Sequence, residues 1–204
     1  MKRTLRRLAL LSVAMVLGFA SCEKENNGYE YVDLGLPSGT KWATCNVGAT
    51  APHEYGNYYA WGEVSTKSDY AIENYILDDV SMSDITGDAT YDAARANLGG
   101  LWRMPTKIEM EELVNSCTWT SVEQNGVYGM QGIGPNGNCI FFPAAGDYDG
   151  ISTDSIGAYG HYWTSTPDEN SNIYFCSFLF YSSEDYIILW DYRTRGRSIR
   201  PVSD

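Results

Sequence analysis

Histidine and basic side chains are scarce in this chain of 204 residues. Only His53 and His161 occur, and neither stands in a His-x-x-His or His-Glu-x-x-His arrangement, which removes the usual basis for a metal hydrolase. The 14 Lys and Arg residues stand against 26 Asp and Glu residues, so the net charge is -12. Most of the surface would therefore repel a phosphate backbone, and we expect no nucleic-acid partner.

Several motifs of catalysis and metal binding are also missing. The sequence has no Gly-x-Ser-x-Gly elbow, no Walker loop and no Cys-x-x-Cys pair, so serine hydrolysis, nucleotide hydrolysis and a zinc site have no basis in it. We expect a protein that is not an enzyme and holds no zinc. Calcium stays open as a cofactor, because residues 146–150 and 168–172 gather oxygen ligands, although neither segment is a complete EF-hand loop.

The long apolar run of this chain lies near its N-terminus, at residues 8–20. It is shorter than the ~18 apolar residues of a spanning helix. Basic residues such as Arg6 and Arg7 precede it, and Ser21-Cys22 follows it. This pattern is typical of a bacterial lipoprotein signal, cleaved before Cys22 and lipidated on the sulfur of that residue. An ordinary secretory signal cleaved near Ser21 is the alternative.

Residues 22–28 then form the lipidated cysteine and a short polar tether. Loss of the signal peptide, residues 1–21, removes four basic and no acidic residues, which leaves a mature charge of -16. Electrostatic attraction cannot hold such a body to an anionic membrane, so lipid has to anchor it. We expect an outer-membrane lipoprotein on the surface or periplasmic face, with a membrane partner through this anchor.

Residues 29–204 read as a single domain, because they contain no linker, low-complexity block or repeat. Segments 30–36 and 40–46 flank a turn at Pro37 and predict an opening hairpin. A helix is predicted at 92–98, before two glycines. A second helix follows Pro105, where Thr106 and Glu109 fit a capping box and an apolar stripe follows at helical spacing.

Most of the remaining elements are expected to be strands and turns. Segments 118–123 and 127–131 enclose Asn125-Gly126, a strong hairpin signal, and segments 173–181 and 186–190 form another expected hairpin. Short strands are predicted at 139–142 and 198–202, and residues 65–90 are expected to be a loop-rich surface excursion. The fold class is therefore α+β, with mostly antiparallel strands, two short helices and long loops.

Seven segments of the chain resemble one known family, in order and over nearly the whole domain. They include Trp102-Arg103-Met104-Pro105-Thr106, and the full set is residues 31–39, 42–49, 59–63, 102–106, 142–146, 162–165 and 198–202. The chain resembles the Fibrobacter succinogenes major paralogous domain (FISUMP), which is similar in turn to the C-type-lectin-like fold of formylglycine-generating enzymes. This resemblance implies that the first and last strands pair, those around Val32 and Ile199, and that long loops lie on one side.

Four cysteines remain beside Cys22, and they allow three complete disulfide pairings. Cys45 ends an opening strand, and Cys117 ends the second helix in a Cys-Thr-Trp that the family resemblance also shows. We therefore expect a disulfide between Cys45 and Cys117. Cys139 and Cys176 lie in strand segments that could be neighbours, but two small buried thiols are an equal interpretation.

Four arginines gather near the C-terminus, at positions 193, 195, 197 and 200. One interpretation is a site for an anion or an acidic sugar. The other is that these arginines form ion pairs with the acidic excess, which is common in acidic proteins. The sequence favours the ion pairs.

Tyrosine is the most informative residue type for binding, since 16 occur. Tyrosine rings stack on sugars and anchor protein interfaces. One cluster follows His53 and another surrounds His161, and the tryptophans within them, Trp61 and Trp163, are expected in the core. The predicted ligand contacts are Tyr55, Tyr58, Tyr159 and His161.

The function that these patterns favour is a non-catalytic recognition or adhesion domain with a glycan or protein ligand. One alternative is a structural envelope component without a small ligand. The other is an enzyme like the formylglycine generators, whose paired active-site cysteines near the C-terminal end have no counterpart here, because no cysteine follows Cys176.

Overall fold

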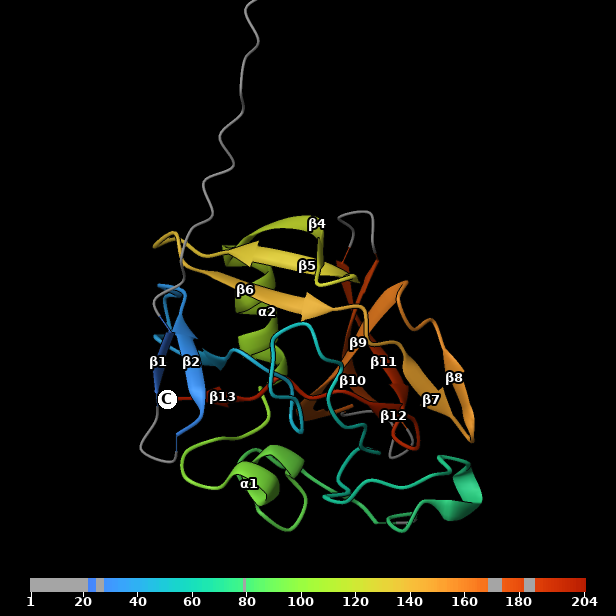
Figure 1. Ribbon diagram of the computed structural model, residues 1–204. Coiled ribbons are helices and arrows are strands. Elements are labelled where there is room, and N and C mark those ends of the chain that lie inside the picture. The colour runs from blue at the N-terminus through green and yellow to red at the C-terminus, as the bar shows by residue number, and fades with distance from the viewer. Residues whose placement is uncertain (1–21, 25–27, 79, 169–173, 182–185) are drawn as a thin grey trace, which may run out of the picture.

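The computed structural model describes residues 22–24, 28–78, 80–168, 174–181 and 186–204. The predicted signal peptide, residues 1–21, lies outside the described residues, as do residues 25–27 of the predicted tether. The described part is a mixed α+β fold of small, mostly antiparallel sheets with two α-helices, as predicted (Figure 1). None of its helices is long and apolar enough to cross a membrane.

The first sheet contains both the first and the last strand of the described fold. Its order is β1 (Cys22–Lys24), β2 (Glu30–Asp33), β3 (Lys41–Ala43) and β13 (Val202–Ser203), with antiparallel neighbours. The opening hairpin is confirmed, and in its turn the amide of Gly39 donates to the carbonyl of Leu36 at 2.9 Å. Residues 22–24, expected as part of the tether, form the edge strand β1 instead.

The expected pairing between the strands around Val32 and Ile199 is wrong. Both edges of β2 are filled, by β1 on one side and β3 on the other, so β13 pairs with the remaining edge of β3. Trp42 in β3 lies opposite Val32 and also opposite Val202. Ile199 precedes β13, and its carbonyl accepts from the amide of Val47 at 3.0 Å.

Both predicted helices are present, and local capping explains where they begin. In α1 (Ala93–Leu98) the carboxylate of Asp92 accepts from the third amide of the helix. In α2 (Lys107–Ser116) the predicted capping box forms: Thr106 accepts from the amide of Glu109, and the Glu109 carboxylate accepts from the amide of Thr106. Two otherwise unpaired donors are thereby satisfied.

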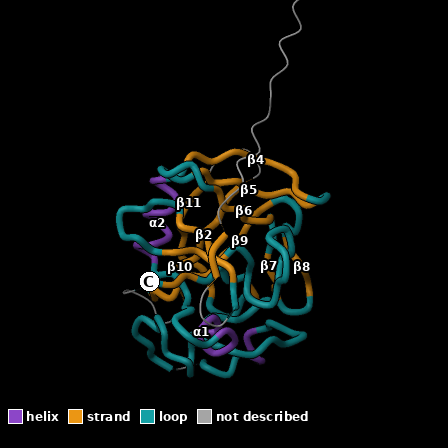
Figure 2. The backbone as a smooth tube through the Cα atoms, turned by 60° about the vertical axis from the view of Figure 1, so that its left-hand side comes forward, coloured by secondary structure: helices purple, strands orange, loops and turns teal. Residues whose placement is uncertain are grey.

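The apolar stripe of α2 is buried, as its spacing predicts, at Met110, Leu113 and Val114. The segment at residues 65–90 is mostly loop, with one 3-10 turn, η1 (Ile72–Asn74). Figure 2 shows loop segments gathered around α1, at the end of the molecule opposite β4 (Thr118–Gln124).

A second sheet has the order β4, β5 (Val127–Ile133) and β6 (Cys139–Pro143), and it lies at the top of Figure 1. The predicted Asn125-Gly126 turn joins β4 to β5. Both turn residues have positive φ, 49° and 81°, as a two-residue hairpin of this type requires.

Two further sheets carry the candidate ligand-binding site. One has the order β12 (Gly196–Arg197), β7 (Asp147–Asp149) and β8 (Ser152–Asp154). The other has the order β11 (Tyr186–Tyr192), β10 (Tyr174–Tyr181) and β9 (Tyr159–Pro167), which confirms the expected last hairpin. A bridge between Gly146 and Gly160 connects β7 to β9.

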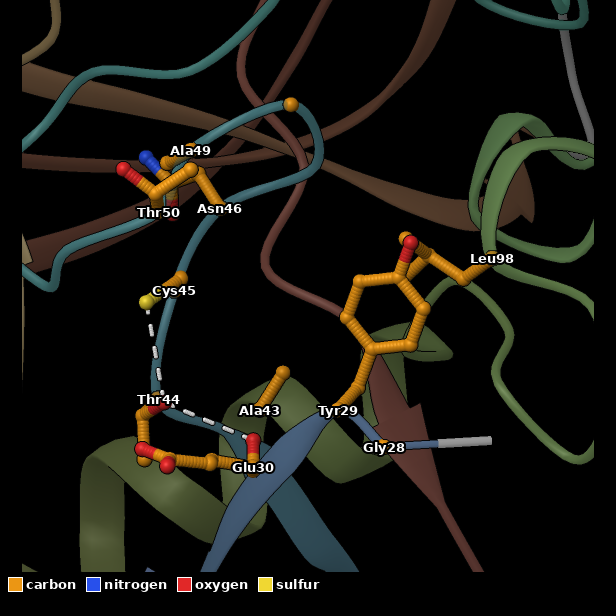
Figure 3. A pocket seen from close by; sticks show the side chains of 11 residues that line it. Gly28, Tyr29, Glu30, Ala43, Thr44, Cys45, Asn46, Ala49, Thr50 and Leu98 are labelled. Carbon is orange, nitrogen blue, oxygen red and sulfur yellow. Dashed lines mark hydrogen bonds between the residues drawn. The ribbon is translucent and has the colours of Figure 1, made fainter. Parts of the chain in front are cut away.

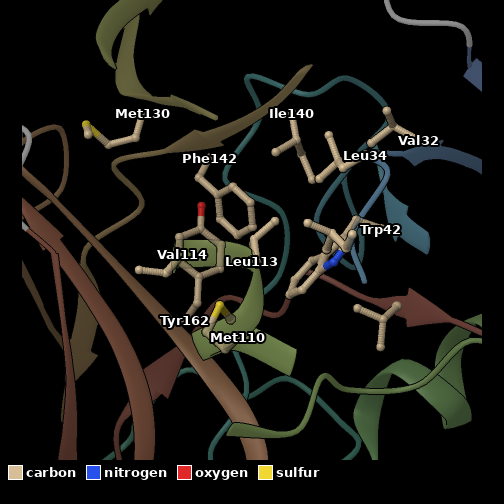
Figure 4. Packing of buried hydrophobic residues seen from close by; sticks show 12 residues of the cluster. Val32, Leu34, Trp42, Met110, Leu113, Val114, Met130, Ile140, Phe142 and Tyr162 are labelled. Atoms are coloured by element: carbon tan, nitrogen blue, oxygen red, sulfur yellow. The ribbon is translucent and has the colours of Figure 1, made fainter. Parts of the chain in front are cut away.

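The two largest clusters of buried side chains are rich in aromatic residues. In the first, Phe142 packs edge-on against Trp42 at 6.1 Å and Tyr162 at 5.0 Å between ring centroids (Figure 4). In the second, Trp61 and Trp163 are fully buried, as predicted, and their indole N–H groups donate to backbone carbonyls at 2.8 Å. The tryptophans of the two clusters therefore serve packing.

The C-terminal segment joins these parts together. The predicted strand at 198–202 is replaced by two shorter strands, β12 and β13. Between them in the sequence, Ser198 forms an isolated bridge to another segment. Arg197 pairs with Asp147 in β7 and bridges to Tyr59, while Ser198 bridges to Tyr162. Residues 196–203 thus contact segments from most of the length of the chain.

Candidate ligand-binding site

A buried carboxylate, Asp147 at the start of β7, lies at the centre of a cluster of charged side chains. Its Oδ2 atom lies 2.9 Å from Nδ1 of His161 in β9 and 3.0 Å from Nη2 of Arg197 in β12. Nη1 of Arg195 lies 3.7 Å from Oδ1. Because an ionised carboxylate only accepts hydrogen bonds, the proton of His161 lies on Nδ1.

The charge of Asp147 is stabilised by these neighbours. Burial alone would raise the pKa of Asp147, but the hydrogen bond from His161 and the positive charge of Arg197 outweigh it, and the pKa is lowered. Arg197 is held in turn by an ion pair with Asp191 and by the face of Trp163, 4.8 Å from its guanidinium carbon. Asp147 is therefore ionised at neutral pH and fixed in position.

The backbone at Gly146 allows Asp147 to take this place. Gly146 has φ of 58°, and a Cβ atom there would lie 2.2 Å from the carbonyl oxygen of Asp154. A side chain at this position would collide with backbone as well as strain the local conformation. Glycine is thus required where the residue before β7 approaches the end of β8.

Three of the four predicted ligand residues meet at this cluster. The hydroxyl of Tyr58 donates to the carbonyl of Ala145 at 2.7 Å. The ring of Tyr159 is stacked with that of His161, with centroids 6.5 Å apart and planes 10° apart. His161 contacts Asp147 directly.

The fourth predicted residue, Tyr55, belongs to the same neighbourhood. Burial is the main cause of the raised pKa of Tyr58, and nearby hydroxyls, including that of Tyr55, add to it. All four predicted residues are half-buried rather than exposed. Tyr58 and His161 already bind other parts of the protein, and the four ligand contacts stay a prediction.

An open pocket of about 410 Å³ adjoins the cluster, and we call it the Arg195 pocket. Arg195 connects the two, because its Nη2 lies 3.1 Å from Oδ2 of Asp149 while its Nη1 faces Asp147. Tyr192, at the end of β11, is 43% exposed. The pocket residues used below are Tyr70, Glu73, Asp149, Tyr192, Thr194 and Arg195.

Sequence reasoning identified parts of this site without joining them. The predicted ion pairing of the arginines is seen at Arg193, which lies 3.8 Å from Asp78, at Arg195 and at Arg197. Tyr192 gave no separate signal, and Asp149 was considered only as an oxygen ligand for calcium within residues 146–150. Their convergence depends on the pairing of β7 with β12, between segments far apart in the sequence.

Arg200 differs from the other three arginines. It is fully buried, and its guanidinium donates to Oδ1 of Asn46 at 2.8 Å and to the carbonyl of Thr44 at 3.0 Å rather than to a carboxylate. Its guanidinium carbon lies 4.7 Å from the centroid of the Phe142 ring. Burial lowers the pKa of Arg200.

The disulfide expected between Cys45 and Cys117 is absent, since both residues are free thiols. Cys45 lies beside Thr44 in the wall of a separate cavity of about 430 Å³ (Figure 3). Cys117 instead packs against the first core cluster, where burial raises its pKa to about 11. Cys139 is the first residue of β6, and the side chain of Cys176 lies outside the described residues.

The two acidic loops considered for calcium have different outcomes. In the first, Asp147 is bound by His161 and arginines and Asp149 by Arg195. Most of the second, residues 169–172, lies outside the described residues. Within the described ranges no group of three or more His, Cys, Asp or Glu side chains is placed to hold a metal ion.

Comparison with known proteins finds no protein family, curated protein or solved structure that matches this chain. The resemblance to the Fibrobacter succinogenes major paralogous domain stays a prediction from the sequence.

Proposed function

We propose that this protein is a non-catalytic recognition domain that binds a neutral glycan at the Arg195 pocket. The observation that carries the proposal is the pairing of Arg195 with Asp149 beside the exposed ring of Tyr192. Asp149 is 66% exposed, and Arg195 is 25% exposed, so both charged groups are accessible from the pocket.

The chemistry of this pair matches neighbouring sugar hydroxyls. A guanidinium only donates hydrogen bonds and a carboxylate only accepts them, whereas a hydroxyl does both. Two adjacent hydroxyls therefore satisfy both groups at once, while the apolar face of the sugar packs on Tyr192. Glu73 and Asp149 add negative charge to the pocket, which disfavours an acidic sugar.

The state of Asp147 supports a non-catalytic role. A general acid or base has to reach the proton it transfers, at about 2.6–3.2 Å. Asp147 is 1% exposed, and its lowered pKa favours the ionised form that His161 and Arg197 bind. Its hydrogen bonds and ion pairs are made with other residues of the protein.

The envelope location and the finer fold assignment belong to the same proposal. Mixed small sheets, two helices, long loops and a sheet shared by the first and last strands support a C-type-lectin-like fold.

The basic, apolar and Ser21-Cys22 pattern supports an outer-membrane lipoprotein anchored at Cys22. Replacement Cys22→Ala should move the protein from the membrane to the soluble fraction, and intact mass should show an acyl addition on the unaltered protein.

A glycan array followed by calorimetry tests the binding proposal. The full-length protein in detergent is compared with Arg195→Ala and Tyr192→Ala, each expected to weaken the best array ligand about tenfold. Tyr128→Ala is the matched control, because Tyr128 is 53% exposed on β5 and does not line the pocket. Equal affinity in all variants would refute this site, and an array without any ligand would favour a structural envelope component.

A further inference from the structure

A third open cavity, of about 450 Å³, lies between the first turn of α2, the end of β9 and β11. We call it the Trp190 pocket. The side chains that matter are Asp84, Thr106, Lys107, Ile108, Thr166 and Trp190. It shares no lining residue with the Arg195 pocket.

Trp190 is unusual among the six tryptophans of the chain. Four of them are fully buried and Trp119 is half-buried, whereas Trp190 is 42% exposed. The ammonium of Lys107 lies 4.8 Å from the centroid of its ring, which favours one orientation of the ring. Ile108 beside it is 77% exposed, so the wall of the pocket presents a broad apolar surface to solvent.

Asp84 supplies a fixed carboxylate beside this aromatic wall. Oδ2 of Asp84 accepts from the hydroxyl of Thr166 at 2.9 Å, and that hydroxyl accepts from the amide of Lys107 at 3.0 Å. Oδ1 of Asp84 accepts from the amide of Thr86 at 2.9 Å. Although burial opposes it, hydrogen bonding lowers the pKa of Asp84, so the carboxylate is held ionised.

We propose that the Trp190 pocket is a second binding site, which takes the ring of a neutral sugar. The apolar face of the sugar packs on Trp190, and its hydroxyls donate to Asp84 and accept from Lys107. This assignment is independent of the ligand proposed for the Arg195 pocket.

The charges around the pocket select against other ligand classes. Lys107 already occupies the cation position over Trp190 and repels a second cation. Asp84 and Asp168 repel an anion. A purely apolar ligand would remove water from the exposed Asp84 carboxylate without offering it a further donor, which is costly for a charge. A ring with an apolar face and several hydroxyls satisfies all of these groups.

Tryptophan fluorescence provides a site-selective test. Because the other five tryptophans are buried or half-buried, acrylamide should quench Trp190 most strongly in the full-length protein. Maltohexaose, cellohexaose, mannohexaose and chitohexaose are the probes, titrated to millimolar concentration. At least one of them should protect Trp190 fluorescence from acrylamide, and the protection should saturate as the sugar concentration rises. Trp190→Phe should remove the fraction of the fluorescence that acrylamide quenches.

Calorimetry with the protecting sugar then locates the contact. Trp190→Phe and Asp84→Asn should each weaken binding about tenfold, while Arg195→Ala should leave protection of Trp190 unchanged. Circular dichroism confirms that each variant is folded. The proposal is overturned if no sugar protects Trp190, if Asp84→Asn binds as tightly as the unaltered protein, or if Arg195→Ala abolishes the protection.

Discussion

Replacing Asp147 by asparagine tests whether the buried charge cluster stabilises the fold. The change keeps the shape of the side chain but removes the negative charge that faces Arg197 at 3.0 Å. The Asp147 side chain is 2% exposed and that of Arg197 is 3% exposed, so solvent hardly screens the pair. Loss of one partner of such a pair costs about 3–5 kcal/mol. Because Asp191 still pairs with Arg197, we expect a loss of about 3 kcal/mol in the free energy of unfolding.

The same substitution should change how stability depends on pH. The pKa of Asp147 is lowered in the folded protein, so near pH 4 the unfolded chain binds more protons than the folded one. The stabilisation is present above the unfolded pKa of about 3.9 and is lost as pH falls through the lower folded pKa. The asparagine variant lacks this titration, and its stability should fall less steeply between about pH 5 and pH 2.

Urea unfolding of four proteins measures both effects: the unaltered chain, Asp147→Asn, Arg197→Met and the double variant. The double variant should lose at least about 1 kcal/mol less than the sum of the single losses, because each single change leaves a buried charge unpaired. The reasoning about this cluster is refuted if Asp147→Asn lowers the free energy of unfolding by less than about 0.5 kcal/mol, within the range of surface substitutions, and leaves the fall in stability at acid pH unchanged.

Other parts of the fold lead to three further expectations. Thr106→Ala breaks the capping box of α2 and should lower the free energy of urea unfolding by about 1 kcal/mol, whereas an unchanged midpoint would show that the cap contributes nothing. Gly146→Ala would place a Cβ atom 2.2 Å from a backbone oxygen at a residue with positive φ. It should lower the free energy of unfolding by at least the ~1–2 kcal/mol of a left-handed residue, and a melting temperature equal to that of the unaltered protein would contradict this. Alkylation after urea unfolding without reductant should label both Cys45 and Cys117, and a recovered disulfide-linked peptide pair would restore the pairing expected from the sequence.

Local signals made much of this fold predictable. The Thr106 and Glu109 capping box marked the start of α2, and Asn125-Gly126 marked the β4–β5 hairpin, because both depend on residues a few positions apart. Strand order was not predictable in the same way. Val32 and Ile199 carry compatible apolar patterns, but β1 and β3 occupy the two edges of β2.

The candidate site was predictable only in pieces. The tyrosine and histidine clusters led to Tyr58, Tyr159 and His161, and these do meet near Asp147. The sequence does not show that Asp147, His161 and Arg197 share one ion-pair network, since their spacing has no local period. That network forms because β7 pairs with β12 and is bridged to β9.

The wide reach of the C-terminal segment bears on when the protein can fold. Residues 196–203 are made after the segments with which they pair, since Trp42, Arg103, Asp147 and Tyr162 all have backbone partners among them. The earlier strands therefore lack these partners until residues 196–203 have been made, and pairings so distant in sequence form slowly.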